Sequence, residues 1–258
     1  QIAAEVKNFA PEKYLNTRQI KFYSRATQFA CTAFHLAKED AGLKEFNPYR
    51  TDVIMGAAQI SFQYTEEEIN RVKVDVVKYR DDIYPTGIFK TTISIPASAI
   101  ANIAQVEGYV STVTSACSSG IDAVGVAAKR IINNEADCVI CGGVDTPISS
   151  IVMNGFSIAK MLTTDNDNPK NALFPFDQRH TKSALGEGSA IFILEERDRA
   201  IARGARIYAE IIGFSQATEN TNEAFLFEKS AKKWIKVIRD VIGEKKQKVD
   251  HINAHGPS

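Results

Sequence analysis

Cys117 has the sequence surroundings of an activated thiol. It follows an alternating, β-rich segment from Tyr109 to Thr114, and it precedes Ser118-Ser119-Gly120 and a run of apolar residues at helical spacing. This pattern predicts a strand, a sharp turn and a helix, with the cysteine at or near the helix N-terminus. The helix dipole and the unpaired backbone N–H groups there favour a thiolate, and they could also hold an oxyanion.

A buried structural cysteine is the alternative for any single Cys, and periodicity alone leaves both interpretations open. The neighbours Ser115, Ser118 and Ser119 are small and polar, whereas a core cysteine usually has bulky apolar neighbours. They favour an accessible side chain at position 117.

A nucleophilic cysteine needs a partner that manages protons or charge, and the chain has only four histidines. His35 falls in a predicted helix, where a structural or surface role is expected, and His180 falls in a basic, polar loop. His255 follows a predicted strand and precedes Gly256, which makes it the better catalytic candidate. A hydrogen-bonded loop histidine is the alternative there.

The sequence predicts neither a metal site nor a cofactor site. His251 and His255 are four residues apart, but their segment is typical of a strand and lacks the glutamate of a zinc-protease helix. Cys138 and Cys141 also lie on a predicted strand, where residues three apart point to opposite faces and cannot chelate one ion.

Two glycine pairs are too short for a nucleotide-binding loop. Gly142-Gly143 and Gly186-x-Gly188 lack the spacing of a dinucleotide fingerprint or a phosphate loop. We expect tight turns and close backbone approach at these positions instead.

The composition favours a cytoplasmic α/β protein. With 258 residues and 44% hydrophobic content, the chain can form one large domain or two smaller ones. The 31 basic and 31 acidic side chains give no global case for nucleic acid, and no apolar run reaches the roughly 20 residues that span a bilayer. Four cysteines do not make a disulfide framework, and no signal peptide is recognisable at Gln1.

Strands and helices alternate along the chain, which predicts the α/β class. The expected helices cover residues 17–41, 65–77 (opened by a Thr65/Glu68 capping box), 94–105, 117–134, 196–203 and 230–242. The expected strands cover residues 52–57, 109–115, 137–143, 189–194, 207–213 and 248–254, and residues 144–181 are expected to be rich in loops. The last helix carries an expected core stripe of Trp234, Ile235, Val237, Ile238 and Val241.

Several short segments follow one another in a specific order: Thr114–Gly120, Ala136-Asp137 through Gly142-Gly143-Val144, Asn154-Gly155-Phe156, Pro175-Phe176-Asp177, Leu185–Gly188 with Leu194–Glu196, Arg203-Gly204-Ala205, and Ile252–Gly256. Together they resemble the β-ketoacyl-acyl carrier protein synthases, the condensing enzymes of the thiolase superfamily, along essentially the whole chain.

The resemblance implies a thiolase-like fold, in which two similar halves form αβαβα layers and which usually dimerises with a second copy. About 1–185 would be the N-terminal half and about 186–258 the start of the C-terminal half. The first family strand would precede Gln1, and the rest of the C-terminal half would follow Ser258. The sequence also ends directly after a predicted strand. Because α/β proteins place catalytic residues in the loops after strands, we expect this sequence to be a fragment.

The resemblance also implies a reaction without a cofactor. Cys117 would accept an acyl group from an acyl carrier protein, and malonyl-carrier protein would decarboxylate and attack the resulting thioester. The Cys117 backbone N–H would contribute to an oxyanion hole, and His255 would hold the malonyl carbonyl. The substrate-binding positions would be Ala116, Phe156, Ser183 and Ser258.

Two segments depart from the family pattern. The His-Gly-Thr-Ser run becomes His255-Gly256-Pro257-Ser258, and the Arg-Asp-Gly-Phe-Val run becomes residues 180–184, with Ser183 in place of phenylalanine. The smaller, polar side chain predicts a bulkier or oxygenated acyl substrate, with neutral drift in a surface loop as the alternative. The family's lysine and second catalytic histidine would lie beyond residue 258.

Two other functions stay open. A non-catalytic subunit of the same fold could set chain length in a heterodimer, although such subunits usually lack the cysteine. An acyltransferase could keep the thioester chemistry and omit the condensation.

Overall fold

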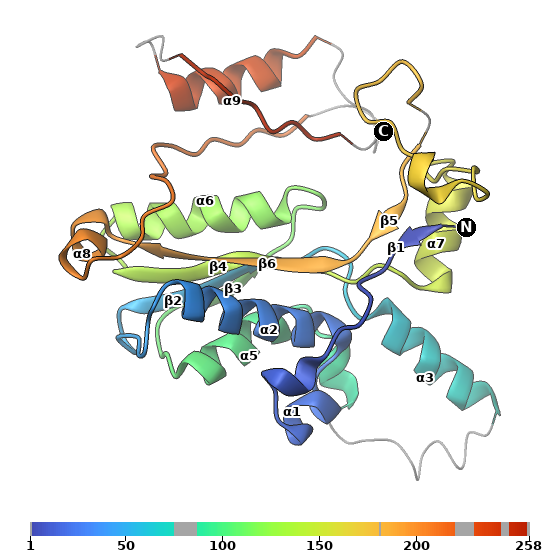
Figure 1. Cartoon of the computed structure of the whole chain (residues 1–258), viewed down its shortest axis with the longest axis horizontal. Coiled ribbons are helices and arrows are strands. Elements are labelled where there is room, and N and C mark those ends of the chain that lie inside the picture. Colours follow the sequence, from blue (N-terminus) through green and yellow to red (C-terminus); the bar gives the residue numbers. More distant parts are fainter. Residues whose placement is uncertain (1, 75–86, 181, 220–229, 244–247, 257–258) are drawn as a thin grey trace.

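A four-stranded sheet forms the centre of the molecule in the computed structural model, which describes residues 2–74, 87–180, 182–219, 230–243 and 248–256 (Figure 1). Its order is β3-β2-β4-β6. The strands are β2 (Thr51–Gly56), β3 (Val110–Val113), β4 (Cys138–Asp145) and β6 (Gly188–Glu195). β2 runs parallel to β3 and β4, whereas β6 is antiparallel to β4. The α/β class is therefore confirmed.

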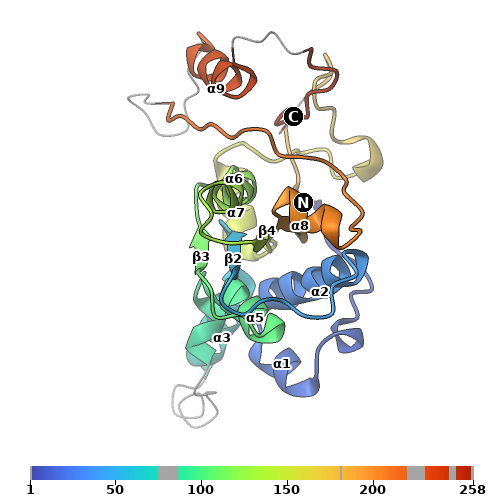
Figure 2. The ribbon, with the colours of Figure 1, turned by 90° about the vertical axis from the view of Figure 1, so that its left-hand side faces the viewer.

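Helices cover both faces of this sheet (Figure 2). On one face, Ile54, Val139 and Cys141 pack with α6 (Ser119–Ile132). On the other face, Val53, Met55 and Ile140 pack with α2 (Arg25–Asp40) and α5 (Ile95–Ala104). Successive residues of β2 thus enter opposite cores, which explains why the whole strand is buried and apolar apart from Thr51 and Asp52.

The remaining elements surround this sandwich. A two-residue strand β1 (Ala3–Ala4) pairs in parallel with β5 (Leu185–Gly186). The other helices are α1 (Thr17–Phe22), α3 (Phe62–Val74), α7 (Ser150–Ile158), α8 (Arg197–Ala202) and α9 (Lys232–Ile242), with short 3-10 helices η1 (Pro11–Lys13), η2 (Gly87–Thr91) and η3 (Pro169–Asn171). No helix in the described ranges is both long and apolar enough to cross a bilayer.

The predicted strands at 52–57, 109–115, 137–143 and 189–194 are confirmed, as are the helices at 94–105, 117–134, 196–203 and 230–242. The single helix at 17–41 is wrong, because the backbone is extended at Tyr23 and Ser24 caps a second helix by accepting from the Thr27 N–H. The capping box at Thr65 is also wrong. α3 starts earlier, and the Thr65 hydroxyl donates back to the Ser61 carbonyl oxygen at 3.1 Å.

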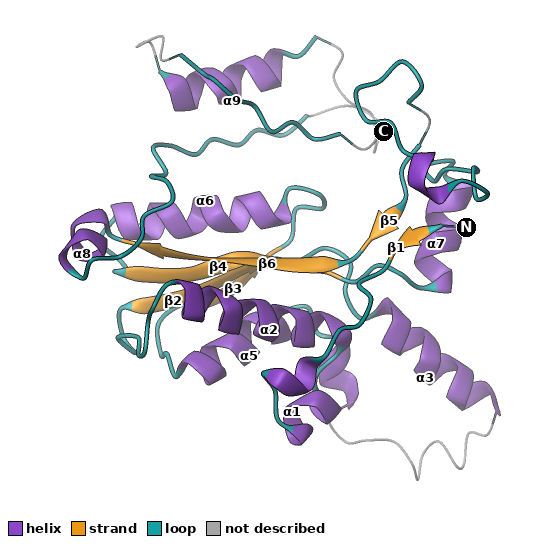
Figure 3. Cartoon of the chain, viewed as in Figure 1, coloured by secondary structure: helices purple, strands orange, loops and turns teal. Residues whose placement is uncertain are grey.

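The expected loop at 144–181 contains α7, which begins after Ser149 accepts a hydrogen bond from the Val152 N–H. Residues 207–213 and 248–254 are not strands (Figure 3). A strand exists only through pairing, and neither segment pairs with another described segment. Residues 75–77 of the predicted second helix lie outside the described residues.

The apolar stripe of α9 forms as predicted but is not buried. Trp234, Ile235 and Ile238 each keep 44–50% of their surface exposed, so this stripe is not part of a core in the described molecule. The predicted division of the chain near residue 185 remains a prediction, and β6 shows only that the central sheet continues past it.

Two strand glycines let α6 approach the ends of β2 and β4 very closely. A Cβ on Gly56, the last residue of β2, would lie 2.2 Å from the Ser119 carbonyl oxygen. A Cβ on Gly143 of β4 would lie 3.2 Å from the Gly120 Cα. Gly142 similarly leaves room for the Ala190 carbonyl oxygen of β6, so the close approach expected at Gly142-Gly143 is confirmed.

Gly56→Ala should destabilise the protein by about 1–3 kcal/mol or more, because the added methyl group meets backbone atoms that cannot rotate away. Urea unfolding of the variant measures this loss. Gly155→Ala is the matched control, since a Cβ there meets nothing within 4 Å and alanine favours the α7 helix by up to about 1 kcal/mol. An equal effect of the two substitutions would contradict the packing described for Gly56.

Candidate active site around Cys117

Cys117 lies in the turn between β3 and α6, at the edge where β2, β3 and β4 all end. This is the edge at which open parallel sheets place their ligands. The side chain is exposed, and α6 begins two residues later at Ser119. The predicted strand, turn and helix around the cysteine are therefore confirmed, and the thiol is accessible rather than structural.

The turn before Cys117 is tight. Ala116 has a φ of 56°, a left-handed conformation that costs a residue with a Cβ roughly 1–2 kcal/mol. The Ser119 hydroxyl donates to the Ala116 carbonyl oxygen at 2.6 Å and accepts from the Ser115 N–H at 2.9 Å. Ser119 is itself buried under the glycine contact, so one buried hydroxyl fixes both ends of the turn.

A carboxylate on the first turn of α6 forms a second set of bonds. Asp122 Oδ2 accepts from the hydroxyls of Ser115 and Ser118, the latter at 2.9 Å. The Ser118 hydroxyl also lies 2.9 Å from the Ser115 carbonyl oxygen. The residues on both sides of the Ala116-Cys117 pair are thus held by one side chain.

The loop after β2 borders the same edge. Asp145, the last residue of β4, accepts hydrogen bonds from the backbone N–H groups of Ala58, at 2.9 Å, and Gln59, at 2.5 Å. The next residue, Thr146, donates its N–H back to the Gln59 carbonyl oxygen at 3.1 Å. These bonds hold the ends of β2 and β4 together beside the cysteine turn.

Two predicted substrate positions lie on the segment that follows β4. Phe156 is half-buried on α7. Ser183 is half-buried and is paired through its backbone. Its N–H donates to the Met161 carbonyl oxygen at 3.0 Å, and its carbonyl oxygen accepts from the Thr163 N–H at 2.8 Å. No described contact joins either side chain to Cys117, so their roles stay predictions.

A partly buried ion pair anchors the chain just after Ser183. The Glu187 side chain is only 3% exposed, and its oxygens accept from Arg25 Nε at 2.9 Å, from Arg25 Nη2 at 2.6 Å and from the Val6 N–H at 3.0 Å. Arg25 also lies 4.7 Å from the centre of the Phe29 ring. The Gly-Glu-Gly motif therefore ties β5 to α2 and to the N-terminal segment.

His255 is exposed in an irregular segment, and no described contact brings its ring to Cys117. The adjacent Gly256 lies against Phe176, since a Cβ there would be 2.6 Å from a ring carbon. The residue after His255 thus lies against the Pro175-Phe176-Asp177 motif, and the role of His255 stays a prediction. Ser258 and Pro257 lie outside the described residues.

The other three cysteines and His35 lie in packed surroundings. Burial raises the pKa of Cys31 and of Cys138 to about 12, and it also raises the pKa of Cys141. His35 is half-buried beside Tyr14, and burial lowers its pKa. No group of three or more His, Cys, Asp or Glu side chains in the described ranges could hold a metal ion.

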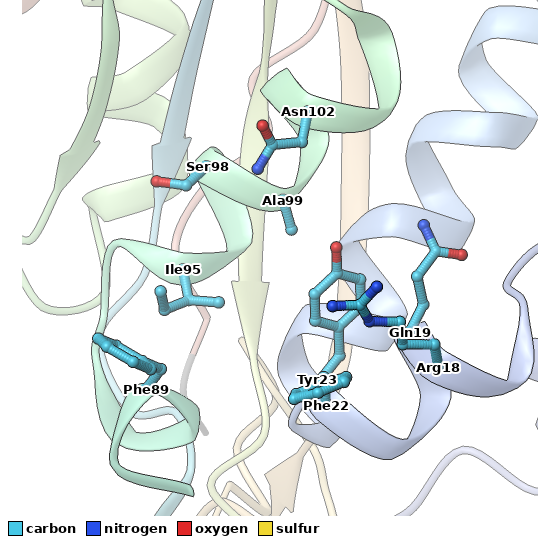
Figure 4. A pocket seen from close by; sticks show the side chains of 9 residues that line it. All are labelled: Arg18, Gln19, Phe22, Tyr23, Phe89, Ile95, Ser98, Ala99 and Asn102. Carbon is cyan, nitrogen blue, oxygen red and sulfur yellow. The ribbon is translucent and has the colours of Figure 1, made fainter. Parts of the chain in front are cut away.

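A cavity of about 330 Å³ opens on the far side of the sheet from α6, between α1, η2 and α5 (Figure 4). Aromatic and aliphatic side chains form much of its wall, with the polar groups of Arg18, Gln19, Ser98 and Asn102 beside them. It contains no cysteine or histidine. Cys117 therefore lies in the turn at the strand ends and not in this cavity.

Sequence reasoning missed two residues of this region. Asp122 lies four residues after Ser118 and seven after Ser115, a helical spacing that was visible in the sequence. Glu187 was noted only as part of a glycine motif. Its partner Arg25 lies 162 residues earlier, and no local pattern connects them.

Comparisons with known proteins agree with these motifs. Residues 3–200 match the family described as β-ketoacyl synthase, N-terminal domain. The chain is 34% identical over 272 residues to the tetracenomycin polyketide synthase ketoacyl synthase alpha subunit of Streptomyces glaucescens, and 32% identical over 266 residues to 3-oxoacyl-[acyl-carrier-protein] synthase 2 of Coxiella burnetii. These alignments include 99% and 100% of this chain but only 62% and 63% of the relatives.

Solved structures give the same result. A β-ketoacyl synthase from Burkholderia phymatum superposes with a TM-score of 0.73 at 27% identity, over 82% of this chain and 52% of that one. The ishigamide ketosynthase/chain length factor superposes with a TM-score of 0.74 at 27% identity, over 82% of this chain and 51% of that one.

Of the four cysteines in this chain, iodoacetamide should alkylate only Cys117 in the folded protein. The other three thiols are buried, and a thiol must be both accessible and ionised to react. Peptide mapping after treatment at pH 8 locates the adduct, and Cys117→Ala should remove it. Unfolding in urea before treatment is the control and should expose all four sites. Modification of Cys31 or Cys138 in the folded protein would contradict the burial described here.

Proposed function

The chain belongs to the β-ketoacyl synthase family, because residues 3–200 match that family's N-terminal domain, and we propose that the whole protein is an acyl-transferring condensing enzyme. Its fold is thiolase-like, as the solved ketosynthases show. One observation carries the proposal: an exposed cysteine in a tight turn at the strand ends, directly before a helix whose first turn is packed against them.

The first step is transfer of an acyl group to Cys117. The thiolate attacks the thioester carbonyl carbon of an acyl-carrier protein, the carbon–sulfur bond to the carrier breaks, and the carrier thiolate leaves and takes up a proton. We assign the Cys117 backbone N–H to the oxyanion that forms on the carbonyl oxygen. The exposed position of Cys117 leaves room for a bulky carrier-linked donor.

The second step forms the carbon–carbon bond. Malonyl-carrier protein loses CO₂, and the electron pair of the broken bond makes an enolate that attacks the acyl-Cys117 carbonyl. Cys117 leaves as the thiolate, and the β-ketoacyl chain stays on the carrier. We assign His255 to the malonyl thioester oxygen, where a donor stabilises charge that appears only during decarboxylation.

Two kinds of partner are proposed. The first is an acyl carrier protein, because a structurally similar ketosynthase has been solved in complex with its acyl-carrier protein. The second is another copy of this chain. β3 is an edge strand of the sheet, and Tyr109 and Val110 are exposed on or beside it, so a second β3 could pair there.

The proposed substrate is a functionalised acyl chain of polyketide type. Several of the relatives are polyketide ketosynthases, which favours this substrate over a saturated fatty acyl chain. Ser183, Phe156 and Ala116 are the proposed contacts, with Ser258 as a further one. The three buried thiols, none of them in a disulfide, favour the reducing cytoplasm as the compartment.

A chain-length subunit without activity is the second candidate function. The ishigamide ketosynthase/chain length factor is one of the structural neighbours, which keeps this function open for the present fold. The accessible Cys117 favours the catalytic subunit. An acyltransferase that omits condensation would keep Cys117 and need no malonyl step.

The full-length protein should gain one acyl group when it is incubated with an acyl-carrier protein, because Cys117 is the accessible thiol. Intact-protein mass spectrometry measures the gain. Cys117→Ala should abolish it, whereas Cys31→Ala should keep it. An adduct that persists on Cys117→Ala would end the proposal.

The same assay tests the substrate when it is run with a mixture of donors. An oxygenated acyl donor should load faster than a saturated donor of equal length. Faster loading and equal condensation of the saturated donor would identify an ordinary elongating synthase.

His255→Ala should still form acyl-Cys117 but should lose malonyl decarboxylation by about 10²- to 10³-fold, the typical effect of removing one oxyanion donor. Release of CO₂ from labelled malonyl-carrier protein measures the loss. His180→Ala is the matched control, because His180 is exposed in another loop and should leave the rate unchanged. A normal rate of CO₂ release by His255→Ala would show that His255 has a structural role and not a catalytic one.

A further inference from the structure

Asp122 forms hydrogen bonds with residues on both sides of Cys117, and the proposed reaction gives it no role. Asp122 lies on the first turn of α6, and its Oδ2 accepts from Ser115 and Ser118. These two residues lie two positions before and one position after Cys117. The Asp122 carboxylate therefore connects the residues that flank Cys117, although Asp122 itself lies on the helix and not in the turn.

The turn needs such a connection because it is strained and exposed. Ala116 has a Cβ and yet adopts a φ of 56°, and residues 114–118 are all exposed to solvent. A strained conformation of this kind persists only where its surroundings fix it. On the buried side, the Ser119 hydroxyl fixes it. On the exposed side, the Ser118 hydroxyl lies 2.9 Å from the Ser115 carbonyl oxygen, and Asp122 accepts from the hydroxyls of both Ser115 and Ser118.

We propose that Asp122 is a positioning residue, which holds the Ser115–Ser118 turn in its left-handed form so that Cys117 and its backbone N–H keep the geometry required for acyl transfer. The inference rests on the proposed function of Cys117. Bonds to an ionised carboxylate are roughly twice as strong as neutral ones, which suits a clamp exposed to water. Because it acts through the two hydroxyls, Asp122 should have no effect once both hydroxyls are gone.

The first experiment measures the turn and does not require activity. Hydrogen exchange followed by mass spectrometry should show at least about tenfold faster exchange of residues 115–119 in Asp122→Ala, because the clamp limits local opening. Asp198→Ala is the matched control. Like Asp122, Asp198 lies on the first turn of a helix, in this case α8, but it is exposed and remote in sequence from the cysteine. Unchanged exchange in Asp122→Ala would overturn the proposal.

The second experiment measures acyl transfer to Cys117. Asp122→Ala should lower kcat about tenfold or more with KM nearly unchanged, since a small misplacement of a reacting group costs up to about 10²-fold. Asp122→Asn, which keeps an acceptor oxygen, should retain most of the rate. In a Ser115→Ala/Ser118→Ala background, the Asp122→Ala substitution should cost nothing further.

The two experiments separate the clamp from the proposed function. An equal loss from Asp122→Ala in both backgrounds would overturn the inference, because the carboxylate would then act without the hydroxyls. If the unmodified protein transfers no acyl group while Asp122→Ala still speeds exchange at 115–119, the proposed function fails and the clamp stands.

Discussion

The close contact between the first turn of α6 and the ends of β2 and β4 is the constraint on which the site depends. Gly56, Gly120 and Gly143 let three backbone segments meet without intervening side chains. This contact buries Ser119, whose hydroxyl then closes the turn at Ala116. The Cys117 thiol is thus positioned by backbone packing, and its side chain stays exposed.

Longer-range interactions fix the segments around this centre. Asp145 holds the loop after β2 against the end of β4, while the Arg25–Glu187 pair holds the segment after Ser183 against α2. Removing Arg25 would be costly, because it would leave the buried Glu187 side chain without its ionic partner. These interactions hold the segments on either side of the Cys117 turn in place.

The surroundings of Cys117 were predictable because they are local. The change from an alternating pattern to helical spacing marks the turn, and Ser118-Ser119-Gly120 follows it directly. The same reasoning failed at residues 207–213 and 248–254, since alternation predicts a strand only where a partner strand is present. α7 was missed because its nine residues were judged together with the turn-rich residues that follow them.

Other features could not be read from one sequence. The Arg25–Glu187 pair joins residues 162 positions apart, and the glycine contact joins three separate elements. Both arise from tertiary packing, which leaves no periodic signal. Asp122 is different, since its spacing from Ser115 and Ser118 was visible but its carboxylate was indistinguishable from an ordinary first-turn acid.

The central claim is that Cys117 carries the acyl group through to carbon–carbon bond formation. A single-turnover experiment tests it directly: the full-length protein is loaded with a labelled acyl group, freed of donor and mixed with malonyl-carrier protein. The account predicts that label leaves Cys117 and appears in a β-ketoacyl chain on the carrier, with one CO₂ released per labelled cysteine. Label that stays on Cys117, or leaves only as the free acid without CO₂ release, would contradict it.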